Sequence, residues 1–373
     1  MSKTFPALPI NRRGHDQSAP TERMLGQEED SMQCVLAVDG GNTKTIALVA
    51  ALDGTILGAG RAGCGDMYNA PTSTRWSDSS TAAIANVEDA ITRALQAAQI
   101  ESSDLIRAVF NMAGLDWPED FALLQTALEE RGYGRSISIQ NDALGVLHAG
   151  SSDNTGVSVV CGTGGATGAR GPDGRTWHSS CWQNQMQGST QLAQKALDAV
   201  YRSELGIDPP TSLTSRVLDF FHLNTVEEVL HLLTSRLKQP PINLGHLAPL
   251  LLDEAQLGDA AARQIVEEHG TALGNYALVA ARFVGLEGTP FRLVLAGGVL
   301  RHPSPLLADA IIATVRTTSP DVQPTRYRFE PIIGVLFTAL EAAEVAINDA
   351  LLENLIPTIP APSLFATVLH PSQ

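Results

Sequence analysis

Short apolar runs separated by glycine-rich polar turns dominate the first part of the chain. Residues 35–38 and 46–49 are apolar and flank the polar turn 39–45, so the pattern predicts a strand–turn–strand hairpin. A second turn at 52–55 precedes another apolar pair at 56–57. We therefore expect three consecutive antiparallel strands at the start of the first domain.

The periodicity then switches between helical and extended spacing. Apolar residues recur at helical spacing over 78–99, and the mostly apolar segment 105–112 predicts a strand. A second helix and a strand at 136–139 follow, and Asp142 opens a further helix at the end of that strand. The order β-β-β-α-β-α-β-α is therefore predicted for a first domain over residues 34–150.

The opening pattern is repeated later in the chain. Residues 156–170 again place two short runs around a turn, which contains Gly162, Thr163 and Gly164, and a Pro-Asp-Gly turn at 172–174 follows. An internal repeat of this kind indicates two similar domains. If each domain presents a glycine-rich hairpin, the two hairpins can hold one polyphosphate from both sides.

The second domain is predicted to span residues 151–355 and to contain a helical insertion over about 187–286. The polar segment 1–33 and the Pro-rich segment 356–373 are expected to be a disordered extension and tail. The other elements predicted in this domain are a buried strand at 291–296, a helix from near Pro305, a strand at 327–329 and an Ala-rich helix at 331–354.

Composition and charge exclude several classes of partner. The chain has 373 residues and a formal net charge of −15, and its length suits about two domains. The longest basic run is Arg12-Arg13, so no nucleic-acid partner is expected. No apolar run reaches the roughly 18 residues of a membrane span, and residues 1–33 lack the apolar core of a secretory signal. We therefore expect no membrane partner and a cytoplasmic location.

The four cysteines, at positions 34, 64, 161 and 181, show no CxxC or metal-finger spacing. Cys34 and Cys161 lie in or beside apolar strands, so both are expected to be reduced, buried thiols. The glycines of 58–63 match the GxGxxG pattern of dinucleotide-binding proteins. That pattern should open a helix, whereas Gly65, Asn69 and Pro71 make the next segment a loop. A glycine-rich strand end is therefore expected here.

The first hairpin turn combines residue types that bind phosphate and magnesium. Glycines let backbone N–H groups point at phosphate oxygens, Thr43 and Thr45 offer hydroxyls, and Lys44 adds a positive charge. Asp39 can hold a hydrated magnesium ion. In isolation the turn could be an ordinary hairpin, but its repeat favours a nucleotide site. The residues predicted to bind ATP are Gly40, Gly41, Asn42, Thr43, Lys44, Thr45, Gly162, Thr163, Gly164, Gly297 and Gly298.

Gly297 and Gly298 follow a predicted strand, at the edge where α/β sheets bind ligands, and leave room for a purine and ribose. Asp142 is the candidate general base, which would accept a proton from a substrate hydroxyl as that oxygen attacks the γ-phosphorus. The alternative is that Asp142 caps its helix. Asp116 could likewise contact a substrate hydroxyl or begin a helix, and Trp182 could stack on a sugar or fill the core.

Together, these motifs resemble the BadF/BadG/BcrA/BcrD ATPase family, which includes the N-acetylglucosamine kinases of the actin/hexokinase/Hsp70 superfamily. The resemblance covers about residues 34–350. Its motifs stand in order at 39–45, 141–142, 162–164, 172–174 and 296–299, with a closing helix at 331–336.

The resemblance implies an α/β fold of two duplicated ribonuclease-H-like lobes, the actin-like ATPase fold, with ATP and Mg²⁺ between lobes that close on binding. It implies that Asp142 is the catalytic base, that Asp39 supports magnesium, and that the two hairpins hold the phosphates. An ATP-dependent carbohydrate kinase acting on a sugar or amino sugar is therefore predicted, and a homodimer is expected.

The chain departs from the sugar kinases of this family where the acceptor is held. Those kinases usually carry Gly-Trp-Gly and then Gly-Asp-Glu-Gly-Ser after the second hairpin. Here the Trp is kept, while Gln and Gly stand near the place of the acidic pair. Relatives commonly carry an Asn in the loop after the third strand, and the residue of this chain nearest to that position is Asp66. The residues predicted to bind the substrate are Asp66, Asp116, Asp142, Trp182 and Gln187.

Amide side chains can hydrogen-bond sugar hydroxyls and acetamido groups, so a carbohydrate acceptor fits this altered pocket. The simpler interpretation is that Gln183, Asn184 and Gln187 are solvent-exposed turn residues. Two other functions stay open at this point: a reductase-activating ATPase and an ATP-binding sensor or regulator. An activating ATPase needs interface cysteines for an iron–sulfur cluster, and the four cysteines here are poorly placed for one.

Overall fold

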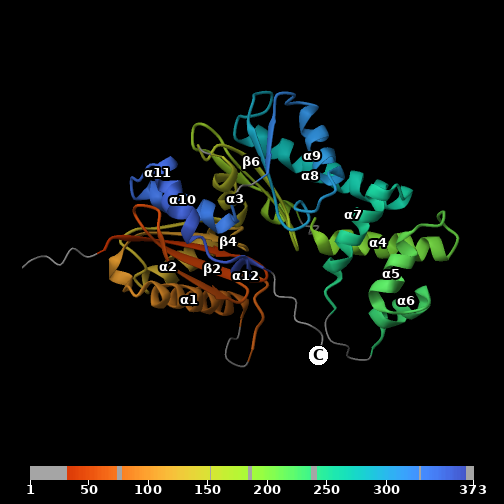
Figure 1. Ribbon diagram of the computed structural model, residues 1–373, viewed down its shortest axis with the longest axis horizontal. Helices are drawn as coiled ribbons and strands as arrows, with labels where there is room; N and C mark the ends of the chain where they lie inside the picture. The colour runs from red at the N-terminus through yellow and green to blue at the C-terminus, as the bar shows by residue number, and fades with distance from the viewer. Residues whose placement is uncertain are drawn as a thin grey trace, which may run out of the picture. The chain divides into compact units, whose positions relative to one another are not determined.

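The computed structural model describes residues 32–73, 78–151, 153–183, 187–236, 242–326 and 329–366 (Figure 1). The predicted disordered extension lies almost wholly outside this part of the chain, as does Asn184. The described residues from Gln33 onward belong to one compact unit, which contains two five-stranded sheets and their helices. No helix in these ranges is both long and apolar enough to cross a bilayer.

The first sheet has the strand order β3-β2-β1-β4-β5. The strands β1, β2 and β3 form the predicted antiparallel meander, and β4 and β5 run parallel to β1. The order of elements predicted for this part of the chain is confirmed. The strand bounds are β1 Cys34–Gly40, β2 Thr45–Ala51, β3 Ile56–Ala62, β4 Leu105–Met112 and β5 Ile137–Asn141.

Both faces of the first sheet are covered by helices, which explains why its central strands are continuous apolar runs. Leu36 and Val38 of β1 face a core built with α1 (Ser79–Ala98) and α2 (Pro118–Glu129). Val35 and Ala37 point the other way, toward α10 (Pro331–Ala342). A short 3₁₀ turn, η1 (Ser102–Asp104), connects α1 to β4.

Gly58 and Gly60, the first two glycines of the GxGxxG pattern, lie in β3 and let α1 pack directly on this edge strand. A Cβ atom at Gly60 would lie 2.0 Å from the carbonyl oxygen of Ala90, and one at Gly58 would lie 2.2 Å from that of Ala94. The expectation of a glycine-rich strand end is therefore confirmed, and close helix–strand packing is its physical reason.

The second sheet has the order β10-β9-β6-β7-β8, with β6 and β7 repeating the antiparallel hairpin of the first sheet. Residues 327 and 328 of the strand predicted at 327–329 lie outside the described residues, and Phe329 is not in a strand; the strand that the structure describes here lies earlier and ends at Arg326. The actual strand contains Pro324, which it tolerates because it lies at the sheet edge. The bounds are β6 Gly156–Cys161, β7 Gly165–Arg170, β8 Thr176–His178, β9 Arg292–Ala296 and β10 Gln323–Arg326.

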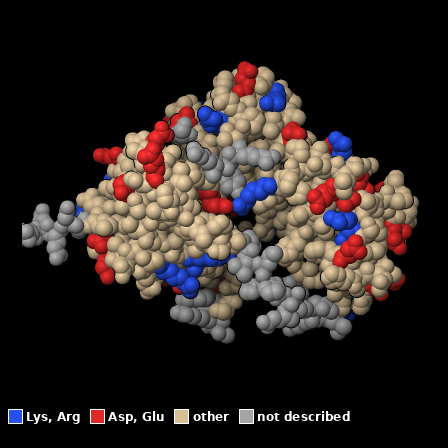
Figure 2. All heavy atoms as spheres, in the orientation of Figure 1, with Lys and Arg blue, Asp and Glu red and all other residues tan. Residues whose placement is uncertain are grey.

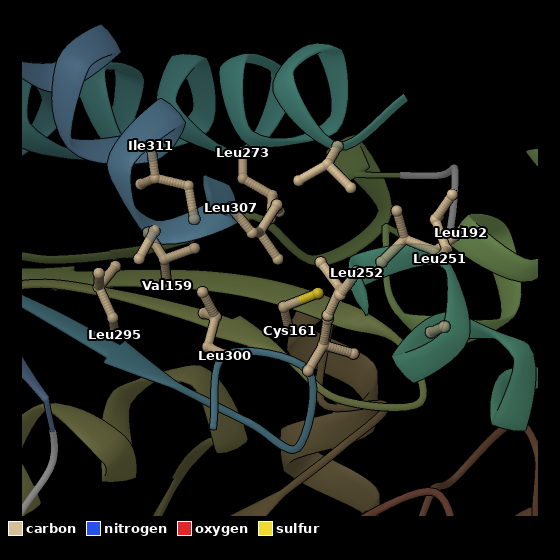
Figure 3. Packing of buried hydrophobic residues seen from close by; sticks show 14 of the residues in the cluster. Val159, Cys161, Leu192, Leu251, Leu252, Leu273, Leu295, Leu300, Leu307 and Ile311 are labelled. Carbon is tan, nitrogen blue, oxygen red and sulfur yellow. The ribbon is translucent and has the colours of Figure 1, made fainter. Parts of the chain in front are cut away.

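The predicted helical insertion is present and packs on one face of the second sheet. Val159 and Leu295 of the strands face Leu273, Leu307 and Ile311 of the helices α8 and α9 in a common core (Figure 3). The helices after β8 are η2 Ser180–Gln183, α4 Ser189–Glu204, α5 Leu213–Phe221, α6 Val226–Thr234, η3 Leu244–His246, α7 Leu247–Leu257, α8 Ala260–Phe283 and α9 Leu306–Arg316.

The helix α3 (Asp142–Gly150) connects the two sheets. Its Val146 and Leu147 pack on the opposite face of the second sheet from the insertion, against Val294. The hydroxyl of Ser158 in β6 donates to the carbonyl oxygen of Ala143 at 2.6 Å. Because α3 continues directly from β5 of the first sheet, its first residue lies where the two halves of the molecule meet.

The end of the chain differs from the prediction. The expected helix at 331–354 is interrupted: α10 stops at Ala342, Glu344 has a φ of 63°, and Asn348 accepts a hydrogen bond from Leu351 N–H to cap α11 (Asp349–Leu355). The expected disorder after residue 355 is wrong for residues 356–366, which form η4 (Ile356–Thr358) and α12 (Pro362–Phe365). The side chain of Phe365 is buried in the core of the first sheet, and this burial holds the segment in place.

Candidate active site

Both predicted phosphate cradles are tight turns between antiparallel strands. In the first hairpin the N–H of Gly41 donates to the carbonyl oxygen of Lys44 at 2.9 Å. In the second, the N–H of Gly162 donates to the carbonyl oxygen of Gly164 at 2.8 Å. Each turn directly follows the first strand of its sheet, so the repeat in the sequence is also a repeat in local structure.

A cavity of about 350 Å³ brings the two hairpins together, and this volume lies in the range of small-molecule sites. Thr43 and Lys44 line it from the first hairpin, Gly162 and Thr163 from the second, and Gly298 from the segment after β9. The remaining lining residues are Ser189, Asn243, Gly245, His246, Ala248, Pro249, Leu252, Val299, Arg301 and His302. Five of the eleven residues predicted to bind ATP therefore share one cavity.

Some of the other predicted ATP-binding residues do not line the cavity but are buried next to it. Thr45 is fully buried, and its hydroxyl already donates to the carbonyl oxygen of Gly63 at 2.9 Å, so it is not free for a phosphate. Gly40 is buried within β1, where a Cβ atom would lie 2.4 Å from Cε of Met112. In the turns themselves Gly41 and Gly164 are half-buried, and Asn42 is exposed.

Gly297 allows the segment after β9 to touch the second hairpin. Its φ is +100°, and a Cβ atom there would lie 2.3 Å from the carbonyl oxygen of Cys161. The same oxygen accepts the N–H of Val299 at 3.0 Å. Gly298 has open space where its Cβ would be. The first glycine therefore makes the backbone contact, and the second leaves the cavity open.

Asp142 does not cap its helix. The side-chain oxygen of Asn141 accepts the N–H of Ala143 at 3.1 Å, and its amide nitrogen donates to the carbonyl oxygen of Leu115 at 3.1 Å. Asn141 is therefore the N-cap of α3, and Asp142 is the first helical residue. This removes the structural interpretation of Asp142 that the sequence left open.

The surroundings of Asp142 favour its neutral form. Burial and the three neighbouring carboxylates Asp39, Asp66 and Asp116 raise the pKa of Asp142 to about 7. A carboxyl group with such a pKa is half ionised at neutral pH and can accept a proton from a hydroxyl. The carboxylates come from four different segments, and the fold brings them close enough to repel one another.

Asp39 and Lys44 form the charged edge of the first hairpin. Burial raises the pKa of Asp39 to about 6, Lys44 opposes this rise, and Glu330 adds to it. Burial lowers the pKa of Lys44. Glu330, just before α10, also pairs with Arg301 at 2.8 Å. On the face drawn in Figure 2, acidic and basic side chains are interspersed.

Sequence reasoning missed Glu330 and Arg301. Arg301 stands three residues after the predicted Gly298, and Glu330 directly precedes the Pro331 that starts the closing helix. These positions beside recognised motifs were the only signal, because neither residue belongs to a motif by itself.

Two of the predicted substrate residues lie beside Asp142. Asp66 is buried, and its carboxylate accepts the N–H groups of Tyr68 at 2.8 Å and Asn69 at 3.0 Å. Asp116 is half-buried and accepts the thiol of Cys181 at 3.3 Å. It does not cap α2: the N-cap is Trp117, and the carboxylate of Asp120 in the first turn accepts the N–H groups of residues 116 and 117.

The segment after the second hairpin differs from the expectation. Trp182 is 76% exposed, so it does not fill the core. The expectation that Gln183 and Gln187 are exposed is wrong, since both are buried. The amide of Gln183 accepts from Thr167 at 3.3 Å and donates to the side chain of Gln187 at 3.4 Å. Burial of these amides follows from packing under the helical insertion, where His269 contacts the carbonyl oxygen of Gln187 at 3.1 Å.

The profile of the BadF/BadG/BcrA/BcrD ATPase family matches residues 36–339. The chain belongs to this family. The matched region contains both hairpins, Asp142, Gly298 and Glu330, so the whole site described above lies within the BadF/BadG/BcrA/BcrD region of the chain.

Two curated relatives of this BadF/BadG/BcrA/BcrD protein are named as kinases. The N-acetyl-D-glucosamine kinase of Dictyostelium discoideum is 24% identical over 322 residues, which cover 84% of this chain and 99% of the relative. The N-acetylmuramic acid/N-acetylglucosamine kinase of Clostridium acetobutylicum is 23% identical over 282 residues, covering 73% of this chain and 87% of the relative.

Solved structures confirm the predicted fold class. A protein of Chromobacterium violaceum, named as a candidate N-acetylglucosamine kinase, has a TM-score of 0.61 and 21% identity, covering 83% of this chain and 99% of its own. A ROK family glucokinase of Streptomyces griseus, solved with glucose and AMPPNP, has a TM-score of 0.50 and 17% identity, covering 84% and 99%. The protein therefore has the duplicated actin-like ATPase fold.

Proposed function

We propose that this protein is an ATP-dependent kinase that transfers the γ-phosphate to a hydroxyl of a sugar or amino sugar. The supporting observation is the cavity lined by both glycine-rich hairpins and by Gly298, together with a proton acceptor, Asp142, whose pKa is about 7. Phosphoryl transfer depends mainly on positioning and on charge neutralisation, with one carboxylate to accept the proton. The names of the two curated relatives support a carbohydrate acceptor.

In this proposal the hairpins hold the phosphates of ATP from two sides. Gly162 lines the cavity without a side chain and Thr163 offers a hydroxyl, while Thr43 and Lys44 offer a hydroxyl and a positive charge. Asp142 accepts the proton of the acceptor hydroxyl while the hydroxyl oxygen forms the new bond to the γ-phosphorus. The bond between the γ-phosphorus and the β,γ-bridging oxygen breaks, which releases ADP. Asp66 and Asp116 would contact the other hydroxyls of the acceptor, and Trp182 and Gln187 remain predicted substrate residues.

The acidic residues of the site suit a magnesium ion held through water. The described residues contain no group of three or more His, Cys, Asp or Glu side chains arranged to hold a metal directly. Asp39 is nevertheless repelled by Glu330 and repels Asp142, and a hydrated cation near Asp39 would relieve that repulsion. When bound there, Mg²⁺ would neutralise phosphate charge.

The cysteines favour a kinase over a reductase-activating ATPase. Cys34, Cys64 and Cys161 are buried, and Cys181 is exposed beside Asp116. A cluster shared between subunits requires thiolates at the protein surface, whereas burial raises the pKa of the Cys161 thiol to about 12. The expected homodimer stays a prediction, which light scattering can test.

A coupled ADP-release assay over amino sugars, hexoses, anhydro-sugars and polyols tests the proposed function. We expect one class of acceptor to stimulate ADP release at least tenfold over the acceptor-free rate, and chelation of magnesium to abolish the stimulation. Mass spectrometry of the acceptor should show one added phosphoryl group. ATP binding without stimulation by any acceptor would contradict a carbohydrate kinase and favour a sensor or regulator.

The pH profile of the reaction should report Asp142. The base must be ionised, so kcat/KM for the acceptor should fall about tenfold per pH unit below the pKa of Asp142, which is about 7. Asp116→Asn removes one repelling carboxylate, so the acidic limb should move to lower pH. The matched control is Asp89→Asn on the exposed face of α1, which should leave the limb in place. Equal profiles for all three proteins would contradict this assignment.

A further inference from the structure

The C-terminal segment of the described chain contacts the first hairpin. Nζ of Lys44 donates to the carbonyl oxygen of Phe365. Nη1 of Arg61 in β3 donates to the carbonyl oxygens of Leu364 and Ala366, both at 2.6 Å. Figure 1 shows α12 beside β2, more than 300 residues away along the chain. We call residues 356–366 the C-terminal strap.

The C-terminal strap is anchored at several points along the first sheet. The side chain of Phe365 is only 7% exposed and packs into the core that α10 and α11 form with this sheet. Thr358 accepts the N–H of Ile56 at 3.0 Å through its hydroxyl. The strap lies beyond residue 339, where the family match ends. It is therefore an ordered feature of this chain outside the matched region.

The contact to Lys44 reaches the proposed nucleotide site directly. The side chain of Lys44 lines the cavity, and the same ammonium group donates to the strap. A lysine ammonium has three N–H donors, so one bond to a carbonyl leaves two for another ligand. Because the carbonyl is neutral, it holds the ammonium without cancelling the charge that a phosphate would meet.

We propose that the C-terminal strap is a positioning element for phosphate binding and that Arg61 is the positioning residue that holds the strap in place. This inference rests on the proposed function. A free lysine side chain loses much rotamer freedom when it binds a phosphate. The strap already restricts the rotamers of Lys44 before ATP binds, and such preorganisation increases the affinity for ATP. Arg61 acts through the strap, and its bonds are to backbone carbonyls rather than to the cavity.

Arg61→Met in the full chain tests this proposal through the dissociation constants of ATP and of adenosine, measured by calorimetry without acceptor. We expect the Kd of ATP to rise roughly 3- to 10-fold, as for the loss of a hydrogen bond, and the Kd of adenosine to stay unchanged because adenosine has no phosphate. Arg61→Lys keeps a donor and should recover most of the ATP affinity. The control is Arg93→Met on α1, an exposed arginine paired with Asp89 in the same helix, which should change neither constant.

Any other change in the two dissociation constants overturns the proposal. Equal weakening of ATP and adenosine would mean that Arg61 only supports the fold, and an unchanged or tighter Kd of ATP would mean that the strap is idle or competes with phosphate. If Arg61→Met does not fold, Arg61→Gln retains an N–H donor on a shorter side chain, and the same comparison applies. An unmodified protein that does not bind ATP would overturn both proposals. ATP binding with the expected Arg61 effect but no acceptor phosphorylation would overturn the kinase alone.

Discussion

Replacing Asp142 by asparagine is expected to lower kcat for acceptor phosphorylation by about 100- to 10,000-fold, the usual contribution of a general base. Asparagine has nearly the same shape but cannot accept the hydroxyl proton. Binding of ATP should change little, because Asp142 is not among the residues that line the cavity. Acceptor-stimulated ADP release and the Kd of ATP, measured on the same preparation, check both statements.

The fold should not suffer from this substitution. Asn141 provides the N-cap of α3, and Asp142 is an acid whose pKa is raised to about 7. Its ionisation disfavours the folded state increasingly as pH rises from about 4 to 7, so Asp142→Asn should unfold at equal or higher urea concentration at pH 8. The matched control is Asn141→Ala, which should lose about 1 kcal/mol of stability but keep the base. Wild-type turnover in Asp142→Asn would exclude Asp142 as the base.

Gly297→Ala is expected to destabilise the protein by about 2–5 kcal/mol, combining the cost of a left-handed backbone with that of overpacking. The new methyl group would lie 2.3 Å from the carbonyl oxygen and 2.4 Å from the carbonyl carbon of Cys161. Those atoms belong to β6 at the start of the second hairpin and cannot move without disturbing the sheet. The midpoint of urea unfolding measures the effect.

Gly298→Ala is the matched control for this prediction. A Cβ atom at Gly298 meets nothing within 4 Å, so stability should stay within about 0.5 kcal/mol of the unchanged protein. Gly298 lines the cavity, so the added methyl group should instead weaken ATP binding. If Gly297→Ala unfolded at the unchanged midpoint, the close contact with Cys161 would have no energetic importance.

Local patterns were sufficient for most of the fold. The strands 105–112 and 137–141, the two hairpins and the helical insertion follow from period-two or helical spacing and from turn residues. The helix and hairpin signals work because they reflect hydrogen bonds between residues close in sequence, and the strand signals work because apolar residues mark the faces that are buried. The predictions failed at the last strand for a tertiary reason and in the Ala-rich segment for a local one. The strand β10 contains Pro324 and is permitted only because it lies at an edge, and the Ala-rich end breaks where Asn348 caps a new helix.

The candidate site was predictable in its residue types but not in its geometry. Thr43, Lys44, Gly162, Thr163 and Gly298 were recognised as motif members, and the fold brings them to one cavity. The sequence could not show which members face the ligand. The hydroxyl of Thr45, for example, is bound to a carbonyl oxygen behind the hairpin. Burial of a turn residue depends on what packs over it, and that is set elsewhere in the chain.

The sequence by itself determined the duplicated Gly/Thr hairpins, the carboxylate of Asp142 directly after a strand, and membership in a family of ATPases. Only the tertiary structure decided that Asp142 lies near Asp39, Asp66 and Asp116, that Glu330 and Arg301 belong to the site, and that Phe365 reaches Lys44. The reason is how far apart along the chain the interacting residues lie. Hairpins and caps are specified by neighbours along the chain, whereas the strap joins residues 321 positions apart through burial and charge that no local pattern records.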